Sequence, residues 1–213
     1  MARHKLNNEQ SGTARRILAA AEHHFAAQGM AGARTDEIAS AAHANKAMLY
    51  YYFGDKRRLH RAVLENLFRQ LRAGVYAPAA RSTQSPRKRL LEFISSYFDF
   101  LASHPNYPRL VQREAMEATK DFEWIVREHL RPSHNSLVRT LEEGIRHGEF
   151  RNVDTHQTAF TIMGMTTSYF AAVPILSHVV GHDLMAPKAL VARKRSLLDF
   201  INHGLLRSKA RSR

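Results

Sequence analysis

The sequence predicts an all-α protein, and three observations support this prediction. Apolar residues recur every three or four positions through most of the 213 residues, which is the period of an amphipathic helix. Residues that start or stop helices stand at the ends of these segments. The first third of the chain shows no strand-like alternation of apolar and polar residues. We therefore expect nine or ten helices, with ample apolar content (44%) for a core.

The N-terminal segment, residues 1–12, is polar and basic and predicts a flexible arm. A first helix follows from Thr13. Ile17 and Phe25 lie on one apolar stripe of this helix, and Gly29 is expected to end it.

Two short helices come next. Thr35 is expected to cap the first of them, with Asp36 and Glu37 in its first turn, where carboxylates suit the exposed N–H groups. The second begins near Asn45, which leaves about three residues for the turn, and Gly54 ends it. Helices joined this tightly must cross steeply, as in a helix-turn-helix motif over about residues 34–53.

A long helix then begins after Asp55, its predicted N-cap, and ends near Leu71. The Pro- and Ser-rich loop that follows marks the change to a second domain. Pro132 is a possible break in the later helices, and Pro174 is expected to kink one of them. Further predicted features are Gly148 as a helix end, a capping-box-like pair Asp154 and Gln157, and helices over 87–103, 107–119, 122–147, 154–180 and 187–206.

The short helix that starts near Asn45 carries four consecutive aromatic residues, Tyr50 to Phe53. At 100° per residue, Leu49 and Phe53 define a buried seam, and Tyr51 lies on the opposite side with Ala47. If the rings were only the core of a three-helix unit, Tyr51 would be left on the outer face. An outward face of this kind fits the major groove of DNA, and it is formed by Asn45, Lys46, Ala47, Met48, Tyr50 and Tyr51.

The formal net charge of +13 also favours a nucleic-acid or acidic partner. Residues 1–60 carry nine basic and five acidic residues (+4), residues 61–187 carry fifteen and thirteen (+2), and residues 188–213 carry eight and one (+7). Because the charges of residues 61–187 nearly balance, this part of the chain is expected to have a role other than binding a charged partner. Charge alone would also serve a sequence-neutral nucleic-acid-binding or nucleoid protein, which remains the alternative. The last residues, 207–213, are interpreted as a basic tail.

Several other classes are disfavoured. The chain has no cysteine, so disulfides and thiolate metal sites are absent, and the cytoplasm is the default compartment. None of the nucleotide-binding, zinc-hydrolase or serine-hydrolase motifs occurs, so we expect no enzyme and no cofactor. We also identify no signal sequence and no apolar stretch of the roughly 18 residues that a membrane span needs.

One stretch closely resembles a known family over about 50 residues: RRILAAAEHHFAAQGMAGARTDEIASAAHANKAMLYYYFGDKRRLHRAVL. It is similar to the DNA-binding domain of the TetR family of bacterial transcriptional regulators, and LYYYFGDK matches the family's L-Y-x-x-F-x-x-K. The resemblance implies a DNA-binding domain over 13–72 whose third helix enters the major groove. It places Asn45, Lys46, Ala47, Met48 and Tyr51 near bases, and Thr35, Tyr50, Tyr52 and Lys56 at phosphates.

This chain departs from the family pattern at three positions. His43 stands where the turn usually has glycine, so it must adopt a positive φ, which histidine tolerates better than most residues. Asn45 and Met48 replace the usual Ser or Thr. These differences bear on the operator sequence rather than on the function.

The resemblance beyond residue 72 is one of architecture. It implies a helical ligand-binding and dimerisation domain over 73–206, in which the last two long helices pair with their copies. Apolar stripes on both helices are consistent with such packing: Ala159, Ile162, Met163, Thr166, Phe170 and Val173 on one, and Leu190, Leu197, Leu198, Ile201 and Leu205 on the other.

Candidate effector-binding residues are aromatic or soft side chains of this second domain with polar anchors nearby, although each alone is more often ordinary core. They are Phe93, Tyr97, Phe100, Met116, Trp124, Met163 and Tyr169, with Gln112, Arg113, Glu114 or His129 as anchors. A metal-sensing alternative rests on His178 and His182 with Asp183, but Gly181 lies between the histidines and no further ligand is evident, so we expect no metal.

We therefore predict a cytoplasmic, nucleoid-associated bacterial regulator. It would bind a palindromic operator in double-stranded DNA as a homodimer, respond to a small-molecule effector of unknown identity, and act as a repressor.

Overall fold

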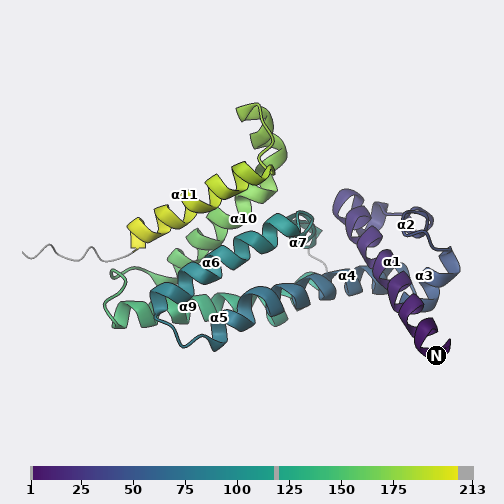
Figure 1. Ribbon diagram of the computed structural model, residues 1–213, viewed down its shortest axis with the longest axis horizontal. Coiled ribbons are helices and arrows are strands. Elements are labelled where there is room, and N and C mark those ends of the chain that lie inside the picture. The colour runs from purple at the N-terminus through teal and green to yellow at the C-terminus, as the bar shows by residue number, and fades with distance from the viewer. Residues whose placement is uncertain (1, 118–119, 206–213) are drawn as a thin grey trace, which may run out of the picture. The chain divides into compact units, whose positions relative to one another are not determined.

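The computed structural model describes residues 2–117 and 120–205, and within them it contains helices and connecting turns with no strand ladder. The all-α prediction is confirmed. The chain divides into two compact units, coloured along the chain in Figure 1. The first is formed by the chain up to Gln70 with Arg109–Phe122, and the second by Leu71–Pro108 with the chain from Glu123 onward. Residues 207–213, the predicted tail, lie outside the described residues.

The first unit begins with the three predicted helices α1 (Ala2–Gly32), α2 (Thr35–Ala41) and α3 (Lys46–Phe53). The long helix α4 (Lys56–Leu71) follows them. The fully buried side chains come from all four helices, so one core holds α3 in place. They are Ile17, Ala21, Phe25, Ile38, Leu49 and Leu59.

Helix α1 differs from the prediction at both ends. Its helical backbone starts at Ala2 rather than at Thr13, so residues predicted to form an arm continue the helix. At the other end Gly29 has a left-handed φ of 73° that kinks the helix, which then continues to Gly32. Two carbonyls at this kink, those of Ala26 and Ala27, accept hydrogen bonds from Arg113 at 3.3 and 2.9 Å. This arginine replaces the hydrogen-bond donors that the kink removes.

The predicted caps around α3 are largely confirmed. Asn45 is its N-cap, Gly54 (φ 81°) is its C-cap, and the Asp55 carboxylate accepts from the backbone N–H of Arg58 at 2.7 Å. The exception is Thr35, which was expected to cap α2. Arg34 occupies that position without a side-chain cap, because the Thr35 backbone is already helical.

The second unit is a set of longer helices and two π-helical segments. α6 contacts α9, α10 and α11, so it lies at the centre of this unit (Figure 1). Tyr97, Phe98 and Leu101 of α6 are buried in the resulting core. The elements are η1 (Arg72–Tyr76), α5 (Ala77–Arg81), α6 (Pro86–Ser103), the start of α7 (Tyr107–Glu117), the second half of α8 (Lys120–Ile125), η2 (Val126–Leu130), α9 (Arg131–Arg146), α10 (Thr155–Val180) and α11 (Pro187–Leu205).

Pro132 does not break the helix as the sequence suggested. The π-helical η2 precedes it, and Pro132 takes the second position of α9, where a helix can accommodate the missing N–H. The other helix ends agree with prediction. Gly148 has a φ of 71°, and the Asp154 carboxylate accepts from the Gln157 backbone N–H at 2.9 Å.

One correction concerns α10, which is long and apolar enough to cross a membrane by length and composition alone. The sequence reading found no such stretch, because threonines and serines are spread through it. Only 28% of its most apolar 18-residue segment is buried within the chain. Most of this helix is therefore not covered by the rest of the same chain.

We expect Gly144→Ala to destabilise the second unit. Gly144 is buried in α9, and a Cβ at this position would overlap the ring of buried Phe150, while the Gly144 carbonyl accepts from the backbone N–H of Phe150 at 3.1 Å. Overpacking of this kind costs about 1–3 kcal/mol. Urea unfolding should detect that loss. The matched Gly74→Ala change, which meets nothing within 4 Å, should leave stability equal or slightly higher. Equal effects of the two changes would contradict this account.

Candidate nucleic-acid interface and effector cavity

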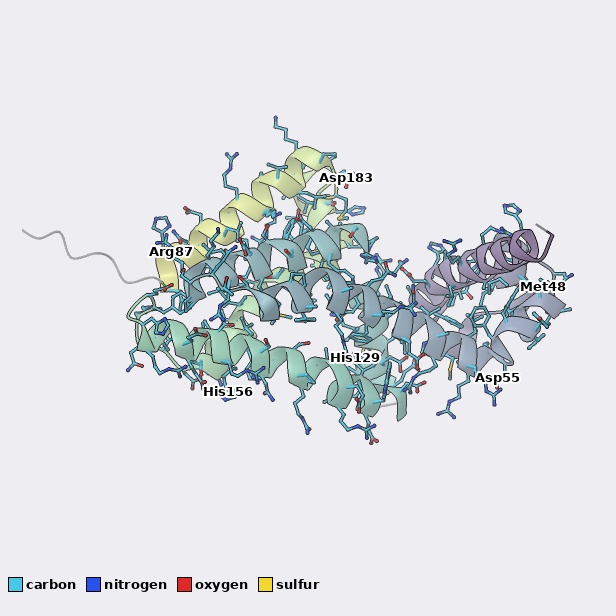
Figure 2. All side chains as sticks on the ribbon, turned by 60° about the horizontal axis from the view of Figure 1, so that its bottom comes forward. Met48, Asp55, Arg87, His129, His156 and Asp183 are labelled. Atoms are coloured by element: carbon cyan, nitrogen blue, oxygen red, sulfur yellow. The ribbon has the colours of Figure 1, made fainter. Side chains whose placement is uncertain are left out.

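The outward face of α3 is arranged as predicted. Tyr51 is 71% exposed and Tyr50 is 42% exposed, whereas Leu49 is fully buried and Phe53 is half-buried. Lys46 and Ala47 are also exposed, and Met48 is half-buried. Figure 2 labels Met48 on α3 and Asp55 at the start of α4. A helix that is anchored on one side and exposes phenolic, small and basic side chains on the other is suited to a DNA groove.

The turn that positions α3 against α2 contains His43. Its φ is 50°, as expected for a residue in the place of glycine, and it is the only non-glycine residue with positive φ among the described residues. The Arg16 guanidinium of α1 donates to the Ala42 carbonyl of this turn at 3.1 Å. The turn is therefore tied to α1 as well as to its own helices.

Two of the predicted phosphate-contacting residues, Thr35 and Tyr50, lie side by side on α2 and α3. The Thr35 and Tyr50 hydroxyl oxygens are 3.4 Å apart. Hydroxyl groups from two helices at one edge of the motif can hydrogen-bond to backbone phosphates, which sets the register of a protein on DNA.

Asn45 and Lys56, which were also predicted to contact DNA, use some of their polar groups within the protein. The Asn45 side-chain oxygen accepts from the Met48 backbone N–H at 2.8 Å, so only its amide N–H groups remain for a base. The Lys56 ammonium donates to the Ala31 and Ala33 carbonyls, both at 3.2 Å, which leaves one of its three donors.

Tyr52 was also expected to reach a phosphate. Its hydroxyl is instead buried and has no hydrogen-bond partner among the described residues, and its ring contacts those of Tyr51 and Phe53. A helical wheel gives the direction of a side chain but not the burial of the atom at its end, so it does not predict this result. In this conformation the Tyr52 hydroxyl does not face a partner outside the protein.

A buried polar cluster joins α4 to α7 and α8 within the first unit. His60 Nε2 lies 3.2 Å from a Glu114 carboxylate oxygen, and Arg61 donates to Asp121 at 2.8 Å. His60, Glu114 and Asp121 are buried, and their potential ligand atoms lie within 4.8 Å of one another. Burial lowers the pKa of His60, and this outweighs the attraction of Asp121 and of Glu117 for the protonated form.

We expect this cluster to make the protein less stable in acid. Because the folded pKa of His60 is below its unfolded value, the unfolded chain binds more protons, and stability falls as the pH drops below about 6.5. Urea unfolding at pH 7.5 and 5.5 should therefore show a smaller loss in His60→Gln, which can still donate to Glu114 but does not titrate. A His60→Gln loss equal to that of the parent would contradict the assignment.

The candidate effector residues separate into two groups. Gln112, Arg113, Glu114 and Met116 belong to the first unit. Arg113 supports the α1 kink and Glu114 pairs with His60, so neither is free to anchor a ligand. Met116 is 85% exposed, which does not fit the wall of a closed chamber.

The remaining candidates belong to the second unit, where an aromatic row forms. The rings of Tyr76 and Phe93 are 5.6 Å apart and those of Phe93 and Tyr97 are 6.1 Å apart, and the Tyr97 hydroxyl lies 3.0 Å from that of Thr167. Burial raises the pKa of Tyr76 to about 12, so its phenol stays neutral. The others are buried (Phe100 and Tyr169) or partly exposed (Trp124, Met163 and His129, the last labelled in Figure 2).

A cavity of about 210 Å³ opens beside this aromatic row, between η1, α6 and α9. Of the predicted effector residues, only Phe93 lines it. The cavity is also lined by four residues that the sequence did not indicate as effector-binding: Tyr76, Arg89, Arg139 and Glu143. Arg89 and Glu143 form an ion pair across 54 positions of sequence, and no local pattern signals such a pair.

The histidines of the metal-sensing alternative do not form one site. His178 Nδ1 lies 2.7 Å from the Pro174 carbonyl oxygen, and His182 Nδ1 lies 3.2 Å from that of Val180. Gly181, with a φ of 73°, ends α10 between them. The two rings are held by separate carbonyls on either side of a helix end.

An apolar surface remains open on the last two helices of the second unit. Phe200 of α11 is 65% exposed, and several other large apolar side chains of both helices are exposed as well. They are Phe160, Ile175, Val179 and Val180 on α10 and Val191 on α11. Exposed apolar side chains gathered on neighbouring helices are candidates for a protein–protein interaction site.

The fold and the exposed face of α3 define a helix-turn-helix protein with a second, all-helical unit. Residues 17–63 match the family model described as bacterial regulatory proteins, tetR family, and residues 86–201 match the tetracyclin repressor-like C-terminal domain. The chain belongs to the TetR family of regulatory proteins.

Individual relatives agree with this assignment. The transcriptional repressor SCO4008 of Streptomyces coelicolor is 37% identical over 109 residues, which cover 51% of this chain and 53% of that protein. The chain thus spans about half the length of the curated relatives it matches first.

Two solved structures show the same fold. The ketosteroid transcriptional regulator KstR2 of Mycobacterium tuberculosis has a TM-score of 0.76 at 22% identity, covering 91% of this chain and 96% of that one. AibR, solved in complex with isovaleryl coenzyme A and operator DNA, has a TM-score of 0.66 at 20% identity, covering 75% and 86%. Likeness at this identity concerns the fold alone.

Proposed function

We propose that the protein is a homodimeric transcriptional repressor that binds a palindromic operator and responds to a small-molecule effector. The observation that carries the proposal is Tyr51, which is exposed at the centre of the outer face of α3 while Leu49 anchors the opposite side. Its ring contacts that of Tyr52 but remains 71% exposed, so packing accounts for little of its surface. Contact with base edges in the major groove does account for it.

The base-contacting set in this proposal is Lys46, Ala47, Met48 and Tyr51, with the amide N–H groups of Asn45. Thr35 and Tyr50 contact phosphates, and Lys56 does so with its remaining donor. Tyr52 is left out of the set, because its hydroxyl is buried. SCO4008 is named a repressor, which favours repression here as well.

The dimer forms through the open apolar surface of α10 and α11. One recognition helix reads only a few base pairs, so a two-fold pair that reads both halves of a palindrome gains both affinity and specificity. This assembly also explains why α10 is apolar over its length although little of that surface is buried in one chain.

The effector enters the second unit, and its binding alters the position of α4. Helical backbone runs without interruption from Lys56 at the start of α4, through η1, to the end of α5. Tyr76 of this run lines the cavity. A ligand that favours one position of η1 would shift the equilibrium between two spacings of the recognition helices. AibR, which was solved with both an acyl coenzyme A and operator DNA, supports a response of this kind.

Neither catalysis nor a cofactor has a part in this function, and the protein would act in the cytoplasm at the nucleoid. Its DNA affinity depends on sequence rather than on net charge alone, which separates it from a sequence-neutral nucleoid protein.

Selection of bound duplexes from a random pool, followed by fluorescence anisotropy at physiological salt, tests the proposal. We expect an enriched palindrome that is bound at least about a thousandfold more tightly than a scrambled duplex of equal length. Equal affinities for the two duplexes would reject the repressor function and favour the sequence-neutral alternative.

A further inference from the structure

The cavity of the second unit combines an aromatic wall with an excess of positive charge. Phe93 and Tyr76 supply rings on one side. Arg89, Arg139 and Glu143 supply two positive charges and one negative charge, a net of +1. A cavity with this lining attracts an anion more than a neutral molecule of the same shape.

Arg89 is only partly satisfied by its neighbours. Its side chain is 17% exposed, and one terminal nitrogen donates to the Glu143 carboxylate. Its Nε is buried and has no hydrogen-bond partner among the described residues. This Nε is closed to solvent, so the Arg89 donors that a ligand could reach lie on its terminal nitrogens, and charge-assisted hydrogen bonds of this kind are strong.

The second cation, Arg139 of α9, is exposed and forms no ion pair with any residue that the structure describes. Two hydroxyls of the lining already donate to the protein backbone, Ser133 to the His129 carbonyl at 2.6 Å and Thr140 to the Ser136 carbonyl at 3.1 Å. The lining also contains the Ser136 hydroxyl and the Tyr76 phenol, and its charged donors are those of the two arginines.

We propose that this cavity binds a small organic carboxylate with an aromatic or branched apolar body. The carboxylate accepts from Arg89 and Arg139, and the body lies against Phe93 and Tyr76. The inference rests on the proposed function, because it names the chemical class of the effector.

The volume of this cavity limits the size of its ligand, and its charge separates it from the hollow beside it. A volume of about 210 Å³ is below the roughly 300–1,000 Å³ of sites for drug-sized ligands, so the occupant is small. The adjoining hollow of about 380 Å³ shares Phe93, but Glu92 is its only charged lining residue. That hollow suits an apolar or neutral group and not the acid itself.

Matched probes can test the charge requirement. Benzoate and benzamide have nearly the same shape but differ in charge, so NMR titrations with each would compare an anion with a neutral analogue. Methyl signals of Leu90 and Leu137, which line the cavity, report binding there and not elsewhere. We expect benzoate to shift them and to bind the full-length protein at least about tenfold more tightly than benzamide.

Variants then test the two arginines. Arg89→Gln and Arg139→Gln should each weaken benzoate binding about tenfold while leaving the weak binding of benzamide unchanged. Arg195→Gln on α11, which removes the same charge outside the cavity, should bind benzoate like the parent. Because Arg139 is exposed, its variant should fold even if loss of the Arg89–Glu143 pair impairs the other.

Three results would overturn the inference: no benzoate-induced shift of the cavity methyl signals, equal affinities for benzoate and benzamide, or unchanged benzoate binding in both cavity variants. The operator experiment is independent of these titrations. Specific operator binding without carboxylate binding would reject the ligand class alone, whereas the absence of any specific operator would reject the proposed function.

Discussion

Phe200→Asp should convert the proposed dimer to a monomer and abolish high-affinity operator binding. Phe200 is 65% exposed on α11, so the change should leave the fold of the single chain intact. A two-fold interface contains each altered residue twice. Losing about 2 kcal/mol per copy therefore raises the dimer dissociation constant about a thousandfold. Sedimentation equilibrium measures the oligomeric state, and anisotropy with the selected operator measures the affinity.

A matched substitution controls for the new charge. Met116→Asp introduces the same carboxylate at an exposed apolar position of the first unit, on a helix other than α10 and α11. It should remain dimeric. A Phe200→Asp protein that stays dimeric at low concentration would show that this surface is not the interface, and operator binding by a stable monomer would contradict the requirement for two copies.

Tyr51→Ala should weaken operator binding about a hundredfold without changing stability or oligomeric state. The side chain is largely exposed, so its removal leaves no cavity in the core. Loss of a base contact costs about 1–3 kcal/mol, and the dimer loses it in both half-sites. Anisotropy with the selected palindrome gives the affinity, and thermal unfolding and size-exclusion chromatography confirm that the protein is intact.

Two further substitutions separate the possible causes. Tyr51→Phe retains the ring and removes the hydroxyl, so it shows whether the contact is apolar or hydrogen-bonded. Met116→Ala removes an exposed apolar side chain of the first unit that lies outside α3 and outside the proposed dimer surface, so it should leave operator affinity unchanged. Undiminished operator affinity in Tyr51→Ala would reject the proposed contact between the outward face of α3 and DNA. An unfolded Tyr51→Ala protein would instead show that the ring belongs to the core.

The fold and the outward face of α3 were predictable because local signals determine both. The N-cap Asn45, the C-cap Gly54 and the N-cap Asp55 act on backbone groups within a few residues, so the bounds of α3 follow from sequence. The direction of Tyr51 follows from the helical period once Leu49 is taken as buried. The positive φ of His43 follows in the same way from the tight turn.

The availability of individual polar groups was not predictable. Lys56 was expected to be free for phosphate, but its ammonium binds the carbonyls of Ala31 at the end of α1 and of Ala33 just after it, more than twenty residues away in sequence. Arg113 was expected in an effector site, but it supports the kink at Gly29. No local pattern reveals such contacts, because they depend on which segments fold against each other.

The sequence by itself determined the all-α class, the helix-turn-helix motif and the face of α3 that Tyr51 occupies. These properties depend on helical period and caps, which act over one or two turns. Only the tertiary structure decided that Arg109–Phe122 joins the first unit, that Tyr52 is covered, and that Arg89 meets Glu143 at the wall of a cavity. Those outcomes depend on contacts between distant segments, and such contacts exist only in the folded chain.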